Sequence, residues 1–261
     1  MPSPINPMKS SGSFQHSVCR WCFPDIVLED LAAAAREIGL TSIELLDPAD
    51  WPVVKKFGLT CAMANGTTTP SKGFNRLDHH GQFVPSMRER IKACAQAGLP
   101  NVIVFSGDRA GLSDDQGLEH CATGLKQIVG EAEKRDVTIC MELLNSKVDH
   151  KDYMCDHTAW GSEFVRRVAS DRFKLLYDIY HMQIMEGDVI RTIQENHACI
   201  GHYHTGGNPG RHEIDATQEL NYPAITRAIK GTGFKGYVAQ EFIPTRDPMA
   251  SLREAVKLCS V

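Results

Sequence analysis

The stretch Thr138-Ile-Cys-Met-Glu-Leu-Leu144 is a short apolar run that carries a carboxylate near its end. Three later runs share this pattern, with Asp178 in Phe173-Lys-Leu-Leu-Tyr-Asp-Ile179, His204 in Ile200-Gly-His-Tyr-His-Thr205 and Glu241 in Tyr237-Val-Ala-Gln-Glu-Phe242. Short apolar runs of this kind are typical of buried strands. The four ionisable residues are 36, 26 and 37 positions apart. A strand-plus-helix unit of a (β/α)8 barrel averages about 31 residues, so the spacing predicts successive units of such a barrel.

The rest of the chain repeats this alternation of strand and helix. Strand-like runs cover residues 16–23, 42–46, 60–65, 101–106, 138–144, 174–179, 201–205 and 236–242. Between them, apolar residues recur at steps of three and four, as in 28–38, 118–132 and 249–259, which is typical of amphipathic helices. Gly39, Gly98 and Gly233 stand where three helices are expected to end. Eight such units predict an α/β fold, a single-domain (β/α)8 TIM barrel.

An open, doubly wound sheet is the alternative architecture. No GxGxxG motif or P-loop opens a predicted helix, so that fold lacks its fingerprint. We place the barrel at residues 15–261 and expect residues 1–14, which are polar and rich in Pro and Ser, to form a flexible N-terminal tail. The polar segments 66–85, 145–160 and 206–222 follow strands and are too long for plain connections, so we expect them to be functional.

Composition excludes several classes of function. The 261 residues carry a net charge of −4 with a pI near 6.3, which argues against a general nucleic-acid binder. No apolar run approaches the ~18 residues that cross a bilayer. The nine cysteines suit reduced thiols, and Cys19-Arg-Trp-Cys22 has no second pair to make a zinc knuckle. We therefore expect a cytoplasmic protein without nucleic-acid or membrane partners; a homo-oligomer is compatible with the sequence.

The four ionisable residues predict a metal site. Because the C-terminal ends of barrel strands meet at one face, Glu142, Asp178, His204 and Glu241 should converge there. Two Glu, one Asp and one His form an oxygen-rich set that suits a divalent cation. Taken singly, each has a structural explanation. Asp178 could cap the next helix, but Asp188 is the better candidate for a cap.

Two histidines of one predicted strand compete for the metal. Side chains alternate along a strand, so His202 and His204 lie on the same face. We assign His204 to the metal because it lies nearer the strand end. His202 remains either a residue that contacts substrate or a buried core histidine.

Four further residues are candidates for substrate binding: His181, Arg211, Glu44 and Lys147. Arg211 could bind a carboxylate or hydroxyl groups through two N–H donors. Each also has a structural explanation, namely a solvated loop histidine for His181, a surface cation for Arg211 and Lys147, and an ion pair for Glu44.

This set of residues suits proton transfer next to a carbonyl group. A divalent ion on the carbonyl and hydroxyl oxygens of an α-hydroxycarbonyl compound lowers the cost of forming an enediolate. Two carboxylates on either side, Glu142 and Glu241, could then act as base and acid in turn. No Ser-His-Asp order or nucleophile elbow competes convincingly.

The motifs resemble those of the hydroxypyruvate isomerase family, which belongs to the xylose isomerase-like TIM barrels, beside the ketose 3-epimerases. The resemblance covers nearly the whole chain after residue 15. It rests on Met141-Glu-Leu-Leu-Asn-Ser146, Tyr177-Asp-Ile-Tyr-His-Met-Gln183, Ile200-Gly-His-Tyr-His204, Asn208-Pro-Gly-Arg-His-Glu213, Glu219-Leu-Asn-Tyr222 and Gln240-Glu-Phe242. It implies a Mg or Mn ion on Glu142, Asp178, His204 and Glu241; we keep Co and Zn as alternatives for the ion. It also implies Glu142 and Glu241 as the acid/base pair, with His181 and Arg211 at the substrate.

One position departs from that family. Many hydroxypyruvate isomerases have Gln where this chain has His204, whereas the ketose epimerases have His. The insertion at 148–157 also enlarges the mouth of the barrel. We therefore expect a small-molecule sugar or keto-acid substrate and favour a ketose or keto-sugar of several carbons over hydroxypyruvate. No Gly-rich helix start follows the seventh or eighth strand, which disfavours a phosphorylated sugar.

Two other functions use the same scaffold. A metal-assisted hydrolase of the endonuclease IV type would need more His, Asp and Glu ligands and a basic face, which the four-residue set and the acidic balance disfavour. A non-catalytic barrel that binds a sugar would keep the ligands without the chemistry.

Overall fold

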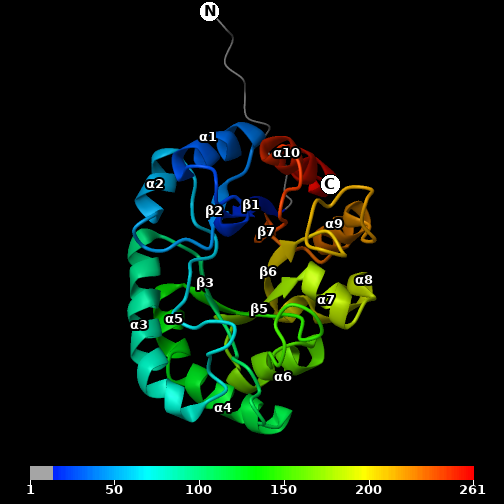
Figure 1. The fold of residues 1–261 in the computed structure, drawn as a ribbon. Helices are drawn as coiled ribbons and strands as arrows, with labels where there is room; N and C mark the ends of the chain where they lie inside the picture. The colour runs from blue at the N-terminus through cyan, green and yellow to red at the C-terminus, as the bar shows by residue number, and fades with distance from the viewer. Residues whose placement is uncertain (1–13) are drawn as a thin grey trace, which may run out of the picture.

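The computed structural model describes residues 14–261, which form one curled parallel sheet surrounded by helices (Figure 1). Seven regular strands lie side by side in the order β2-β1-β7-β6-β5-β4-β3. Their bounds are β1 Gln15–Cys19, β2 Ser42–Glu44, β3 Asn101–Val104, β4 Thr138–Glu142, β5 Phe173–Asp178, β6 Ile200–Thr205 and β7 Tyr237–Gln240.

The segment at residues 60–65, predicted as the third strand, closes the barrel between β2 and β3 without forming a regular strand. Parallel bridges at Thr60 and Ala64 join it to both neighbours. At Ala62, side chains take the place of the ladder: its N–H donates to Ser42 Oγ (2.8 Å), and its carbonyl accepts from Asn101 Nδ2 (2.7 Å). The prediction of a regular strand here was wrong, because polar side chains compete for the backbone groups.

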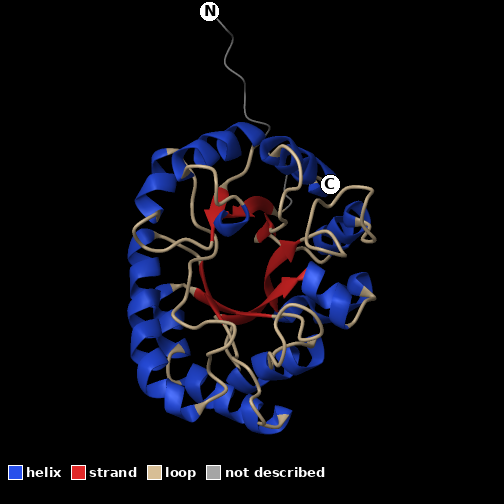
Figure 2. Cartoon of the chain, in the orientation of Figure 1, coloured by secondary structure: helices blue, strands red, loops and turns tan. Residues whose placement is uncertain are grey.

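Helices cover the outside of the sheet, as Figure 2 shows. The alternation of strand and helix confirms the predicted single-domain TIM barrel. The helices are α1 Leu28–Ile38, α2 Trp51–Lys56, α3 His80–Ala97, α4 Asp114–Lys126, α5 Val129–Arg135, α6 Thr158–Val168, α7 Ile179–Met185, α8 Val189–Asn196, α9 Tyr222–Gly231 and α10 Pro248–Cys259. Short 3-10 turns are η1 Arg20–Cys22, η2 Leu77–His79 and η3 His197–Cys199.

Two of the three glycines predicted to end helices do so. Gly39 and Gly98 end α1 and α3 with φ of 99° and 69°, in the left-handed region that favours glycine. Gly233 instead lies one residue beyond Thr232, the C-cap of α9. The apolar periodicity at 118–132 spans two helices, α4 and α5, rather than one.

Several predicted bounds were wrong. β1 ends at Cys19, and Cys22 lies in η1, so the two cysteines do not share a strand; all nine cysteines are free. The segment 66–85 includes the start of α3 at His80. The tail prediction for residues 1–13 lies outside the described residues. Phe14, which we assigned to the tail, is 2% exposed and packs in the core.

An apolar layer inside the barrel underlies the ends of the strands. A small cluster of Met63, Ile103, Cys140 and Leu176 is separate from the main core. Since side chains alternate, Cys140 and Leu176 lie on the same strand faces as the residues two positions later, Glu142 and Asp178. Among residues 14–261, no helix is long and apolar enough to cross a membrane.

Candidate active site

Four ionisable residues converge at the C-terminal ends of neighbouring strands. Glu142 and Asp178 are the last residues of β4 and β5, His204 is the next to last of β6, and Glu241 directly follows β7. One donor atom from each lies within 4.8 Å of the others, and all four side chains are buried. We refer to these residues as the acidic cluster.

Asp178 has two roles in this arrangement. Its Oδ1 accepts a hydrogen bond from the backbone N–H of His181 (3.1 Å) and so caps α7, while its Oδ2 accepts from Arg211 Nη2 (2.6 Å). The side chain of Asp188 makes no capping bond to α8. Our preference for Asp188 as the cap was therefore wrong: one carboxylate has two oxygens and serves the helix and the acidic cluster together.

His204 contacts charged groups through both ring nitrogens. Its Nδ1 lies 3.2 Å from Glu142 Oε1 and 2.7 Å from Glu241 Oε2. Its Nε2 lies 2.9 Å from Glu44 Oε1. The imidazole therefore stands between the acidic cluster and a fourth buried carboxylate.

Arg211 provides a cation at the edge of the acidic cluster. Its guanidinium contacts the carboxylates of Asp178 and Glu241. The guanidinium carbon lies over the ring of Tyr180, 4.8 Å from its centroid, and 5.7 Å from that of Trp21. These aromatic faces hold the cation in place by cation–π attraction.

Burial and charge move the pKa values of the acidic cluster in different directions. Burial raises the pKa of Glu142 to about 7. Burial alone would also raise the pKa of Glu241, but the charges of Arg211 and His204 hold it well below its ordinary value. Burial opposes protonation of His204, yet interactions with the Cys19 sulfur and Glu241 raise its pKa. The two glutamates therefore differ in their readiness to carry a proton.

A cavity of about 540 Å³ opens over the acidic cluster. Glu142, Glu241, His181 and Arg211 line it, as do Asp149 and His150 of the loop after β4. Much of the remaining wall is apolar, with Trp21, Phe105, Leu144, Val148 and Ile243 among its residues. Such a cavity, mostly apolar with a few convergent polar groups, is typical of a small-molecule site.

The structure places the predicted substrate residues in two groups. His181 and Arg211 line the cavity, and both are buried rather than solvated. Lys147 does not line it: its ammonium donates to the carbonyls of Ile184 and Met185 at the end of α7 (3.0 Å each). Our assignment of Lys147 to the substrate therefore has no support in the geometry, because the C-terminal carbonyls of a helix attract the cation.

Glu44 and His202 also lie away from the cavity wall. Both are 0% exposed, and His202 Nε2 lies 2.7 Å from Glu44 Oε1. Burial alone would raise the pKa of Glu44, but His202 and His204 lower it to about 2. The structure thus places Glu44 and His202 beneath His204 rather than in the wall of the cavity.

Sequence reasoning missed several residues around the cavity. Asn145 Nδ2 lies 2.6 Å from His181 Nδ1 and 2.7 Å from Asp149 Oδ2. Tyr180 donates its hydroxyl to the same Asp149 oxygen (2.9 Å). We singled out this loop for its length and polarity, but its sequence has no period that indicates which side chains face inward.

The donor set of the acidic cluster fits a divalent cation. The acidic cluster has three carboxylates, and the Arg211 guanidinium contacts two of them, so ionised carboxylates leave an excess of buried negative charge, which is costly unless compensated. The Nδ1 atom of His204 is buried and lies 3.2 Å from Glu142 Oε1 and 2.7 Å from Glu241 Oε2, although neither contact has the geometry of a hydrogen bond. A divalent ion among these oxygens would take the place of any proton on Nδ1. Oxygen donors with one imidazole suit Mg or Mn, with Co or Zn also able to bind.

Comparison with known proteins agrees with the fold. Residues 32–259 match the family model described as xylose isomerase-like TIM barrel. The chain belongs to this family.

Curated relatives match this xylose isomerase-like barrel over most of its length. A 2-oxo-tetronate isomerase of Cupriavidus necator is 33% identical over 240 residues, which cover 86% of this chain and 90% of that protein. A putative hydroxypyruvate isomerase of Homo sapiens is 24% identical over 255 residues, covering 89% and 90%. Both relatives carry the names of isomerases, and they confirm the resemblance to the hydroxypyruvate isomerase family seen in the motifs of this chain.

A solved structure of an AP endonuclease, family 2, from Brucella melitensis shares the fold. It superposes with a TM-score of 0.81 at 22% identity, covering 92% of this chain and 96% of that one. The 3-keto-D-glucoside 4-epimerase YcjR from E. coli gives a TM-score of 0.79 at 18% identity, covering 95% and 99%. At these identities the likeness concerns the fold alone.

Proposed function

We propose that this xylose isomerase-like barrel is a divalent-metal-dependent isomerase or epimerase of an α-hydroxycarbonyl compound, a ketose or keto-sugar in preference to hydroxypyruvate. The observation that carries the proposal is the acidic cluster, whose four residues meet at the inner side of the cavity. In this proposal Glu142, Asp178, His204 and Glu241 hold the ion. The isomerase relatives support the reaction class.

Glu142 and Glu241 are proposed to move the proton. They are the two members of the acidic cluster that line the cavity, whereas Asp178 and His204 are 0% exposed behind them. A carboxylate that reaches the substrate can take a proton from the carbon next to the carbonyl, and the same group or its partner can return it. Trp21 Nε1 donates to Glu241 Oε1 (2.6 Å), which leaves Oε2 directed at His204.

Arg211 and His181 are proposed to bind substrate oxygens. Both line the cavity, and Nη1 of Arg211 lies 3.0 Å from Nε2 of His181, so their polar atoms form one continuous surface. The divalent ion, when bound, supplies electrostatic stabilisation of the negative charge that develops on the substrate oxygens.

Solvent deuterium is expected to enter a ketose in the presence of the enzyme and Mn²⁺, because abstraction of the carbon-bound proton exposes it to exchange. Excess chelator should abolish both exchange and isomerised product, and added Mn²⁺ should restore them. The measurement is ¹H NMR of a panel of ketoses and keto acids in D₂O. Absence of exchange and product with every compound would contradict the proposal and favour a binding or hydrolytic role; full activity in chelator would contradict metal dependence.

A free ketose or keto-sugar is expected to be turned over with a kcat/KM at least about tenfold above that of hydroxypyruvate, equivalent to ~1.4 kcal/mol in transition-state binding. A cavity of about 540 Å³ with Asp149 and His150 in its wall offers polar groups beyond the reach of so small a keto acid. Side-by-side rates for hydroxypyruvate, fructose, tagatose and a sugar phosphate measure this preference. A clear preference for hydroxypyruvate would show that we over-interpreted His204 and the loop.

A further inference from the structure

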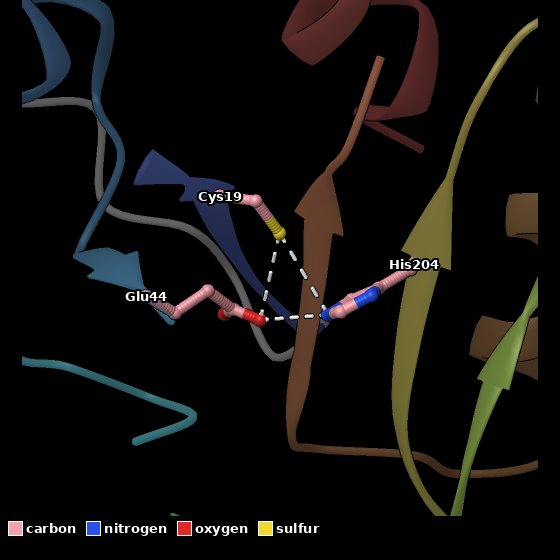
Figure 3. A group of neighbouring side chains, drawn as sticks. All are labelled: Cys19, Glu44 and His204. Atoms are coloured by element: carbon pink, nitrogen blue, oxygen red, sulfur yellow. Dashed lines mark hydrogen bonds and ion pairs between the residues drawn. The ribbon is translucent and has the colours of Figure 1, made fainter. Parts of the chain in front are cut away.

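A buried carboxylate, that of Glu44, faces His204 beside Cys19 (Figure 3). Glu44, the last residue of β2, is 0% exposed, and its Oε1 lies 2.9 Å from His204 Nε2. The other ring nitrogen faces Glu142 (3.2 Å) and Glu241 (2.7 Å). One imidazole thus joins two carboxylate environments through its two different nitrogens.

The Glu44 contact keeps a proton on Nε2 of His204. An ionised carboxylate only accepts hydrogen bonds, so the ring nitrogen that faces it must be a donor. Nδ1 also faces carboxylates, those of Glu142 and Glu241, so without an ion both ring nitrogens can hold a proton. A divalent ion at the acidic cluster would take the place of the proton on Nδ1, and the Glu44 contact would then hold the remaining N–H on Nε2. Glu44 cannot ligate the same ion, because the ring stands between them.

We propose that Glu44 is a positioning residue that fixes the ring orientation and the tautomer of His204, so that Nδ1 is presented to the divalent ion. This inference rests on the proposed function, since it assumes an ion at the acidic cluster. A metal-bound histidine whose second N–H is held by a carboxylate keeps its orientation and gains basicity as a ligand.

The neighbours of Glu44 agree with this role. His202 Nε2 lies 2.7 Å from the same Oε1 atom, so a second imidazole holds the carboxylate in place. Cys19 Sγ is farther away, 3.8 Å from His204 Nε2 and 4.0 Å from Glu44 Oε1, and a thiol is a weak donor and acceptor. Glu44, rather than Cys19, therefore makes the dominant contact with Nε2.

The test compares Mn²⁺ affinity, measured by the EPR signal of free Mn²⁺, in the wild type, Glu44→Leu and Glu44→Gln. Glu44→Leu removes the acceptor at similar volume and is expected to weaken binding by about 10–100-fold. Glu44→Gln keeps a carbonyl acceptor for Nε2 and should weaken it less. The matched control is Glu213→Gln, which alters another buried carboxylate, bound to Thr245 and Ser251, and should leave Mn²⁺ affinity unchanged.

A second readout reports the contact itself. In the Co²⁺-loaded protein, the Nε2 proton of a cobalt-bound His204 gives a paramagnetically shifted ¹H NMR signal that disappears in D₂O. Glu44→Gln is expected to move this signal, since a neutral amide oxygen is a weaker acceptor than a carboxylate. Glu44→Leu should broaden or remove it through faster exchange. If the Leu variant does not fold, the Gln variant alone still tests the proposal.

Unchanged Mn²⁺ affinity together with an unmoved N–H signal in Glu44→Gln would overturn the role of Glu44 and leave the metal site itself intact. Equal losses of affinity in Glu44→Gln and Glu213→Gln would also overturn it, because they would indicate a general effect of removing buried charge. A wild-type protein that binds neither ion would instead overturn the proposed function.

Discussion

Glu241→Gln is expected to lower the rate of substrate proton exchange by about 10²–10⁴-fold, the usual contribution of a positioned acid or base. Glutamine keeps the size of the side chain and can still accept from Trp21, which donates to Oε1 in the wild type (2.6 Å). It cannot take up a proton, and it removes one negative charge that faces His204 Nδ1 and Arg211. The same substitution should therefore also weaken binding of a divalent ion.

Deuterium incorporation at saturating Mn²⁺ measures the Glu241→Gln effect, and thermal unfolding verifies that the variant is folded. Measuring at saturating metal separates loss of the proton acceptor from loss of metal. Glu213→Gln again provides the matched control, because that carboxylate is buried and accepts its hydrogen bonds from Thr245 and Ser251, outside the acidic cluster. Full exchange activity in Glu241→Gln would disprove the acid/base assignment.

Asp178→Asn is expected to abolish measurable metal binding and exchange while preserving the fold. Asn caps helices as well as Asp does, so its side-chain oxygen can still accept from the His181 N–H. The substitution removes the charge that pairs with Arg211 at 2.6 Å and that would bind the ion. Loss of one partner of a buried pair commonly costs about 3–5 kcal/mol, here offset because Arg211 still contacts Glu241.

Asp178→Ala separates the two roles of this residue. It should lose function to the same extent as Asp178→Asn but be less stable by a further ~1 kcal/mol, the typical value of an N-cap. Calorimetric metal titration and denaturant unfolding of both variants give the two quantities. Metal binding by Asp178→Asn at the wild-type level would exclude Asp178 as a ligand.

The strand ends of the site could be predicted because they follow from local patterns. An apolar run that ends on Glu142 or Asp178 marks both a strand and its terminus, and barrel topology then brings such termini together. The alternation of side chains also placed His202 and His204 on one face. These are short-range regularities that one sequence contains in full.

The depth of a residue inside the barrel could not be predicted in this way. Glu44 ends its strand just as Glu142 does, yet it lies beneath His204 and away from the cavity. The period of a strand gives the direction of a side chain but not its height relative to residues on strands far away in the sequence. The position of the Lys147 side chain could not be predicted for a similar reason, because the α7 carbonyls that accept from its ammonium belong to another segment of the chain.

The irregular segment at residues 60–65 interrupts the regular strands of the barrel wall, and we call it the seam. All four residues of the acidic cluster come from the uninterrupted arc β4 to β7, whereas the seam lies between β2 and β3, on the opposite side. On its β3 side the backbone hydrogen bonds of this segment run through one residue, Ala64, whose N–H donates to Asn101 and whose carbonyl accepts from Ile103. Local opening is cheapest where few backbone hydrogen bonds must break. Breathing of the barrel should therefore start at the seam, so the wall there can yield to an incoming ligand while the spacing of the acidic cluster stays constant.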